Sequence, residues 1–319
     1  MHELTRRRFL IASALAACGA ASPFARGAGR DITVALVLKA GNDPFTAAMI
    51  AAATAFQAHS PYPFKLIVRS TEGETDVSQQ AAYVESLAAK SVSAIVLAPA
   101  DSRRLVPAVA TCVRQGVLAV TIDNPLDADA LREARLHVPF VGPDNRRGAR
   151  LVGDYLARRL HAGERAAIIG GVASDRNAQQ REVGFREAMR AASVRIVDAQ
   201  PGDWDYAKGR AAATAMLATQ PGLRALLCAN DNMARGAVDA VNMAHLRGRV
   251  LITGYNASAA IKPMLADGRV LATVDQFADK QAVYGIDVVL QALIEQRRQD
   301  DLPDRVETPL VLVTKDSAS

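Results

Sequence analysis

The chain has 319 residues, of which half are hydrophobic and 22% are charged, and its 38 Lys and Arg against 33 Asp and Glu give a formal net charge of +5. This is the composition of a globular protein of about two domains, and it excludes a disordered chain, a coiled coil and a collagen-like fibre. Three cysteines are too few for a disulfide scaffold, and the longest apolar run is shorter than the roughly 20 residues that span a bilayer.

The excess positive charge lies at the N-terminus. Residues 1–30 contain five arginines and a single acid, Glu3, so the rest of the chain carries 33 basic and 32 acidic side chains. A nearly neutral body argues against nucleic acid or an anionic membrane surface as the partner of the folded protein.

Residues 1–30 have the pattern of an export signal, with a basic start, an apolar stretch over residues 9–17 and small residues after it. The alternatives are a disordered basic tail or a first helix of the fold. The run Thr-Arg-Arg-Arg-Phe-Leu at 5–10 resembles the twin-arginine signal, which carries folded proteins across the bacterial inner membrane. The run Leu-Ala-Ala-Cys at 15–18 also resembles a lipobox, in which Cys18 is lipidated; ordinary cleavage at residues 19–22 or near Ala28 stays open. The predicted location is the periplasm, with or without a lipid anchor on Cys18.

From residue 31 the sequence alternates between short apolar runs, typical of buried parallel strands, and longer helical stretches. The first part predicts strands over residues 32–38, 64–69, 94–98 and 117–122, and helices over residues 45–59, 76–90 and 103–115. Residues 123–145 are less regular and contain three prolines, which indicates a crossover between two lobes.

The alternation then restarts. It predicts helices over residues 147–160, 178–191, 206–219, 233–244, 257–266 and 280–296, and strands over residues 166–170, 195–199, 225–228, 250–253, 270–274 and 307–313. Strands alternating with helices indicate parallel sheets, so the predicted fold class is α/β with two Rossmann-like, doubly wound lobes. Ligands bind outside the carboxyl ends of such strands, so the two lobes would share one crevice.

Catalytic and cofactor motifs are absent from the sequence. It has no G-x-x-x-x-G-K-[ST] phosphate loop, no G-x-G-x-x-G fingerprint and no G-x-S-x-G nucleophile elbow, and its five histidines lack metal-ligand spacing. Cys112 and Cys228 lie in apolar stretches and are expected to be buried free thiols. The sequence therefore favours a binding protein with no catalytic residue, no metal and no cofactor over an enzyme.

The residues that follow the predicted strands are aromatic side chains together with Asp, Asn and Gln, and few are cations. Carboxylate and amide groups each engage neighbouring hydroxyls, and aromatic faces pack on the C–H faces of a sugar ring. Each residue also has a local alternative, because Asp43 and Asn230 would serve as helix N-caps and Pro44 or Pro125 would shape turns. Seven such loops at one crevice favour a site for a neutral, hydroxyl-rich small molecule.

The chain resembles the periplasmic sugar-binding proteins of the ribose-binding type, over residues 31–313. The runs that carry the resemblance are Asn-Asp-Pro-Phe at 42–45, Val-Thr-Ile-Asp at 120–123, Arg-Glu-Val-Gly-Phe at 181–185, Gln-Pro-Gly-Asp-Trp at 200–204, Ala-Asn-Asp-Asn-Met-Ala-Arg-Gly at 229–236 and Ala-Thr-Val-Asp-Gln at 272–276. The resemblance implies a type I periplasmic binding protein with a hinge that the chain crosses three times. It also implies one lobe of residues 31–142 plus 277–307 and a second of 143–276 plus 308–319.

The resemblance carries the family's ligand positions onto this chain, and Lys39, at the end of the first strand, is added as a compensating donor or a solvated lysine. The candidate ligand-binding residues are Lys39, Asp43, Phe45, Thr46, Asp123, Asn124, Gln179, Trp204, Asn230, Asn256 and Gln276. Trp204 is the aromatic expected to stack on the sugar from the second lobe. Ribose binders carry arginine at the positions of Asn124 and Gln179, phenylalanine at Thr46 and aspartate at Asn256, so another pentose, a hexose, a furanose or a polyol fits as well.

The resemblance implies that a sugar or polyol is trapped when the lobes close and is then delivered, by a monomer, to the membrane permease of an ABC importer. The main alternative is a periplasmic sensor that presents sugar occupancy to a histidine kinase or chemoreceptor. A transcription regulator would need an N-terminal helix-turn-helix where the export signal lies, and an enzyme is disfavoured by the missing motifs.

Overall fold

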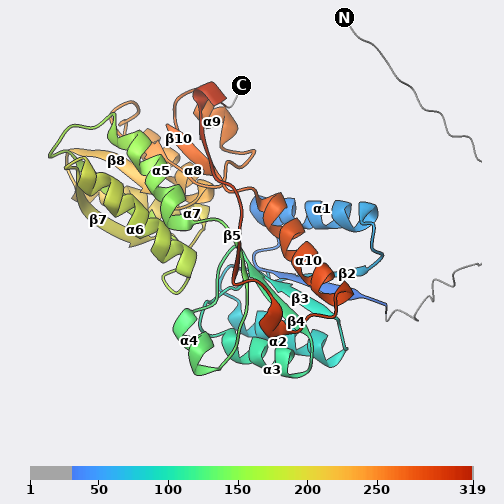
Figure 1. Ribbon diagram of the computed structural model, residues 1–319. Coiled ribbons are helices and arrows are strands. Elements are labelled where there is room, and N and C mark those ends of the chain that lie inside the picture. The colour runs from blue at the N-terminus through green and yellow to red at the C-terminus, as the bar shows by residue number, and fades with distance from the viewer. Residues whose placement is uncertain (1–30, 318–319) are drawn as a thin grey trace, which may run out of the picture. The chain divides into compact units, whose positions relative to one another are not determined.

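The structure is a computed structural model that describes residues 31–317 and contains two six-stranded sheets in that range (Figure 1). The first sheet has the strand order β11-β5-β4-β3-β1-β2, with all pairings parallel. Its strands are β1 (Thr33–Leu38), β2 (Lys65–Ser70), β3 (Ala94–Leu97), β4 (Leu118–Ile122), β5 (Phe140–Gly142) and β11 (Arg305–Glu307).

The second sheet has the order β12-β10-β9-β8-β6-β7, in which β12 pairs antiparallel with β10 and the other pairs are parallel. Its strands are β6 (Arg165–Gly170), β7 (Arg195–Pro201), β8 (Leu223–Cys228), β9 (Leu251–Thr253), β10 (Ala272–Asp275) and β12 (Val311–Thr314). This architecture confirms the predicted α/β class with two doubly wound lobes.

Helices cover both sheets. They are α1 (Pro44–His59), α2 (Val77–Ala89), α3 (Val106–Arg114), α4 (Ala128–Glu133), α5 (Asn145–Ala157), α6 (Arg176–Ala191), α7 (Tyr206–Thr219), α8 (Asp231–Met243), α9 (Lys262–Ala266) and α10 (Ala278–Ile294), with short 3-10 turns at Gln299–Asp301 and Lys315–Ser317. In the first lobe α1 packs beside α10 and α2 beside α3; in the second, α5 packs against α6 and α7 against α8 (Figure 1).

Strand β1 shows why the predicted strands are continuous apolar runs. Val34, Leu36 and Leu38 belong to the core shared with α1 and α10, whereas Ala35 and Val37 face the core under α2 and α3. Successive side chains of a strand point to opposite faces, so a strand covered on both sides must be apolar at every position.

The chain passes between the sheets three times, between β5 and α5, between β10 and α10, and between β11 and β12. The predicted single strand over residues 307–313 is wrong, because it is divided into β11 in the first sheet and β12 in the second. Pro309 lies in the connection and cannot donate to a sheet ladder. Residues 123–145, predicted to be irregular, contain α4 and β5, and the helix predicted over 257–266 begins only at Lys262.

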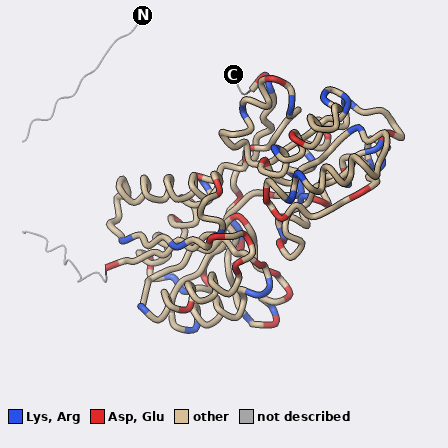
Figure 2. Tube along the Cα trace, turned by 180° about the vertical axis from the view of Figure 1, so that it is seen from behind, with Lys and Arg blue, Asp and Glu red and all other residues tan. Residues whose placement is uncertain are grey.

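Other predictions concern charge and membrane spans. Basic and acidic residues are interspersed over both lobes (Figure 2). Within residues 31–317 no helix is both long and apolar enough to cross a bilayer. Cys112 and Cys228 are buried free thiols, and burial raises the pKa of Cys112 to about 12. The predicted export signal over residues 1–30, with Cys18, lies outside the described residues.

Candidate functional site

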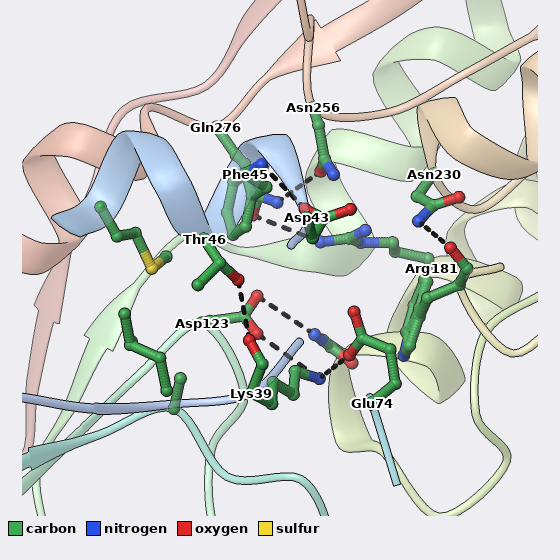
Figure 3. A pocket seen from close by; sticks show the side chains of 15 residues that line it. Lys39, Asp43, Phe45, Thr46, Glu74, Asp123, Arg181, Asn230, Asn256 and Gln276 are labelled. Atoms are coloured by element: carbon green, nitrogen blue, oxygen red, sulfur yellow. Dashed lines mark hydrogen bonds and ion pairs between the residues drawn. The ribbon is translucent and has the colours of Figure 1, made fainter. Parts of the chain in front are cut away.

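A pocket opens between the two sheets, at the carboxyl ends of their strands (Figure 3). The first lobe contributes the end of β1, the loops after β2, β3 and β4, and the start of α1, and the second contributes α6 and the loops after β7, β8, β9 and β10. The lining residues are Leu38, Lys39, Asp43, Phe45, Thr46, Met49, Glu74, Ala98, Asp123, Asn177, Arg181, Trp204, Asn230, Asn256 and Gln276.

Lys39 lies among three carboxylates. Its Nζ is 3.2 Å from Asp175 Oδ2, 3.3 Å from Glu74 Oε2 and 3.6 Å from Asp123 Oδ2. Burial alone would lower the pKa of Lys39, but the attraction of the three carboxylates outweighs it and the pKa is raised. For the acid Glu74 burial acts in the opposite direction and raises the pKa to about 7. Lys39 is therefore a buried cation, not a solvated lysine at a strand end.

Trp204 is held in one orientation at the wall of the pocket. Its indole Nε1 donates to Asp175 Oδ2 at 2.9 Å, and its side chain is buried. The ring lies against Gly171, where a Cβ would come within 2.0 Å of Cζ2. The ring position thus depends on the hydrogen bond from Nε1 and on the absence of a side chain at Gly171.

Arg181 is a second buried cation in the pocket. Its guanidinium donates to Asn145 Oδ1, to the carbonyl of Ala229 and to Gln276 Oε1, at 2.8, 2.8 and 3.3 Å. It also lies over the Tyr255 ring, 3.8 Å from the centroid. Burial lowers its pKa from the usual arginine value. These contacts use part of the five N–H donors of the guanidinium, so donors remain for a ligand.

Amide side chains continue this network across the pocket. Gln276 Nε2 donates to Asn256 Oδ1 at 2.7 Å, and Gln281 Nε2 donates to the Gln276 carbonyl at 3.0 Å. Gln281 Oε1 accepts from the backbone N–H of Asp123 at 3.1 Å. The amide groups hold one another in place, so their remaining donors and acceptors have defined directions.

Asp231 supports the loop that carries Asn256. Its carboxylate accepts from the backbone N–H of Ser258 at 2.7 Å and from Thr273 Oγ1 at 2.8 Å, and its own N–H donates to the Tyr255 carbonyl. Asn256 has a φ of 117°, a region that residues with side chains rarely adopt. Burial raises the pKa of Asp231 to about 7.

Capping and pocket lining are combined in Asp43 and Asn230. Asp43 caps α1 by accepting from the N–H of Phe45, and its other oxygen accepts from Asn232 Nδ2 of the second lobe at 2.6 Å. Asn230 caps α8 by accepting from the N–H of Met233, while its Nδ2 donates to the Trp204 carbonyl at 3.0 Å. Each of these residues therefore both caps a helix and lines the pocket, so the two interpretations of the sequence are compatible.

Nine predicted residues line the pocket. They are Lys39, Asp43, Phe45, Thr46, Asp123, Trp204, Asn230, Asn256 and Gln276. Asn124 and Gln179 were also predicted to bind the ligand, but neither lines the pocket. Asn124 is fully buried, where its side chain donates to the Pro99 carbonyl and accepts from the N–H of Asn177. Gln179 is exposed and bonds to Arg176 and the Ala173 carbonyl.

The polar residues that the sequence prediction missed are Glu74, Asn177 and Arg181. Asn177 and Arg181 are four residues apart on α6 and therefore share the face toward the cleft, whereas Gln179, two positions on from Asn177, faces away. Helical spacing could have identified Arg181. Glu74 lies in the loop after β2, and the position of that loop at the end of a parallel strand was a usable signal.

The charges around the pocket are two cations, Lys39 and Arg181, and four carboxylates, Asp43, Glu74, Asp123 and Asp175. Within the part of the chain that the structure describes, no group of three or more His, Cys, Asp or Glu has the arrangement of a metal site. The set offers many hydrogen-bond donors and acceptors beside the faces of Trp204 and Phe45.

The sequence pattern of the periplasmic binding protein domain matches residues 34–297. The chain belongs to the periplasmic binding protein family. The D-ribose/D-allose-binding protein of Pseudomonas aeruginosa is 46% identical over 317 residues, which cover 98% of this chain and 99% of that protein. The D-allose-binding periplasmic protein of Escherichia coli is 33% identical over 229 residues, covering 70% of this chain and 73% of that protein.

Solved structures of periplasmic binding proteins share the fold. An ABC transporter solute-binding protein of Burkholderia multivorans, with an unknown ligand interpreted as α-D-erythrofuranose, has a TM-score of 0.87 and 51% identity, covering 90% of this chain and 100% of that one. One of Actinobacillus succinogenes with bound D-allose has a TM-score of 0.84 and 29% identity, covering 90% and 99%. These proteins bind solutes and are not described as enzymes, and the predicted resemblance to type I periplasmic binding proteins is confirmed.

Proposed function

We propose that this protein captures a neutral monosaccharide of the D-ribose or D-allose kind in the cleft between its lobes and delivers it to an ABC importer. The observation that carries the proposal is the composition of the pocket. The first lobe contributes carboxylates and the cation Lys39, the second contributes amides and the cation Arg181, and these groups lie beside Trp204 and Phe45 in the lining. Sugar recognition needs such hydroxyl partners beside an apolar ring face.

The balance of charge supports a neutral ligand. Four carboxylates around two cations give a local excess of negative charge, which disfavours sugar acids and sugar phosphates. A buried hydroxyl or buried polar group left unpaired costs about 1–3 kcal/mol, so the site should discriminate sharply between epimers. The relatives named for D-ribose and D-allose indicate where the search for the ligand begins.

The test is calorimetric titration of the purified protein with D-allose, D-ribose, other pentoses and hexoses, and myo-inositol. The expected result is saturable binding of one or two of these sugars at one site per chain. Thermal unfolding with each sugar gives an independent measure, because a ligand that binds only the folded state raises its stability. Failure of every neutral sugar to bind would refute the proposal.

The remaining parts of the proposal concern the place of action. We infer that residues 1–30 direct export to the periplasm by the twin-arginine route, and that the mature protein acts as a monomer on a membrane permease. Lipidation of Cys18 and cleavage further along the segment give N-termini of different mass, which mass spectrometry of the exported protein distinguishes. The sensor function is disfavoured by relatives described as import or solute-binding proteins.

A further inference from the structure

Asp175 occupies the N-cap position of α6 but does not cap that helix. Within residues 31–317, five other helices have an aspartate at this position, and in four of them it accepts a hydrogen bond from a backbone N–H of the first turn; Asp76 of α2 does not, whereas Asp43, Asp127, Asp144 and Asp205 do. Such a cap contributes about 1 kcal/mol to stability. The carboxylate of Asp175 forgoes this contribution, so its orientation has another cause.

The carboxylate of Asp175 faces the cleft instead. Its Oδ2 accepts from Trp204 Nε1 at 2.9 Å and from Lys39 Nζ at 3.2 Å. The side chain is completely buried, and its Oδ1 has no hydrogen-bond partner. A carboxylate removed from water in this way needs a nearby cation, and Lys39 is the cation in contact with it.

Lys39 and Asp175 belong to different lobes. Lys39 follows β1 of the first sheet and has two carboxylates of its own lobe beside it, Glu74 and Asp123. Asp175 follows β6 of the second sheet and has Trp204 of its own lobe beside it. When the lobes separate, each side chain keeps these partners and the contact between Lys39 and Asp175 is broken, together with hydrogen bonds between the lobes such as that from Asn232 to Asp43.

Asp175 is not among the residues that line the pocket, whereas Lys39 and Trp204 are. Asp175 therefore reaches a bound ligand only through these two side chains. We propose that Asp175 is a closing residue, which binds Lys39 when the lobes meet and so prolongs the residence of the sugar without selecting which sugar is bound. This inference rests on the proposed function.

The distinguishing property of a closing residue is kinetic. Association begins with the lobes apart, when Asp175 and Lys39 are not in contact, so the association rate should not depend on the pair. Dissociation requires the lobes to part and the ion pair to break. Loss of a buried charge partner acts mainly on the dissociation rate, and about a 10- to 100-fold increase is expected.

The experiment compares the wild-type protein with Asp175→Asn, which keeps an oxygen acceptor for Trp204 Nε1 and loses the charge that faces Lys39. Stopped-flow fluorescence of Trp204, the single tryptophan of the chain, gives the association and dissociation rates for each sugar that binds. The control is Asp127→Asn, an N-cap in the first lobe that bonds within its own lobe. A second variant, Asp175→Ser, also removes the charge and supplies a good N-cap for α6, but it takes the carboxylate acceptor from Trp204 Nε1, so only Asp175→Asn isolates the loss of charge.

The expected result is a faster dissociation in both Asp175 variants, with an association rate within about twofold of the wild type and, for Asp175→Asn, an unchanged order of preference among sugars. Unchanged dissociation in both Asp175 variants would overturn the inference alone. A changed order of preference in Asp175→Asn would also overturn it, because Asp175 would then contact the sugar. If the wild-type protein binds no sugar, the proposed function fails and the inference fails with it.

Discussion

Replacement of Gly171 by alanine tests whether the position of the Trp204 ring determines sugar affinity, and it changes no side chain that lines the pocket. A Cβ at residue 171 would lie 2.0, 2.2 and 2.3 Å from Cζ2, Cη2 and Cε2 of the Trp204 ring. Carbon atoms in contact lie about 3.5–4.0 Å apart, so the ring must move by about 1.5 Å. Gly170→Ala is a matched control, since a Cβ there meets only the Gln200 carbonyl, at 3.8 Å.

The size of the effect follows from the contacts of Trp204. A movement of about 1.5 Å breaks the 2.9 Å bond from Nε1 to Asp175 and misaligns the ring face in the pocket. A hydrogen bond to a charged group contributes about 1.5–3 kcal/mol, which corresponds to a 10- to 100-fold weaker affinity for the sugar. Overpacking should also lower the free energy of unfolding by about 1–3 kcal/mol.

Calorimetry measures the affinity, and the emission of Trp204 reports the displacement of the ring directly, since no other tryptophan contributes. Gly171→Ala should shift the emission toward that of a solvated indole, and Gly170→Ala should match the wild type. If Gly171→Ala binds sugar with wild-type affinity and emits at the wild-type wavelength, then the absence of a side chain at residue 171 does not fix the position of the Trp204 ring.

Five further substitutions test the remainder of the site and the residues that support it. Trp204→Ala and Asp123→Ala should each abolish sugar binding, because one removes the stacking face and the other a buried carboxylate acceptor; unchanged calorimetric affinity in both would contradict the site. Arg181→Met should weaken sugar binding by at least about tenfold through loss of charged hydrogen bonds. Gln179→Ala, on the exposed face of α6, should bind sugar within about twofold of the wild type. If titration shows the larger loss of affinity in Gln179→Ala, then Gln179 is the ligand-binding residue, as the sequence predicted. Burial raises the pKa of Asp231 from 3.8 to about 7, so the folded protein retains a proton that the unfolded chain releases, and this carboxyl makes the free energy of unfolding fall as the pH rises between those values. Asp231→Asn should flatten the denaturation profile over that range, and an unchanged slope would show that Asp231 is not the titrating group.

The sequence was sufficient to predict the fold because its periodicity is determined by burial on both faces of each sheet. Short strands at the crossings were harder to predict. β5 and β11 have three residues each, and β11 pairs with a strand far away in the chain, so local pattern contains little information about either.

The candidate site was predictable where a residue directly follows a strand, as Lys39, Asp123 and Gln276 do. It was less predictable on α6, where each residue is rotated by about 100° from the one before, so Gln179 and Arg181, two positions apart, lie on different faces of the helix. Asp175 contacts Lys39 across two lobes that are built from discontinuous segments, so the local sequence pattern does not identify it as a partner of Lys39.

The strands β11 and β12 have a consequence for the synthesis of the protein. Each forms an edge of a different sheet, and the two are separated by only three residues near the end of the chain. Neither lobe has all of its strands until residues 305–314 have left the ribosome, although domains usually fold in order during translation. Completion of both sheets therefore depends on the same short segment, and a nascent chain that stops before residue 305 lacks an edge strand in both halves at once.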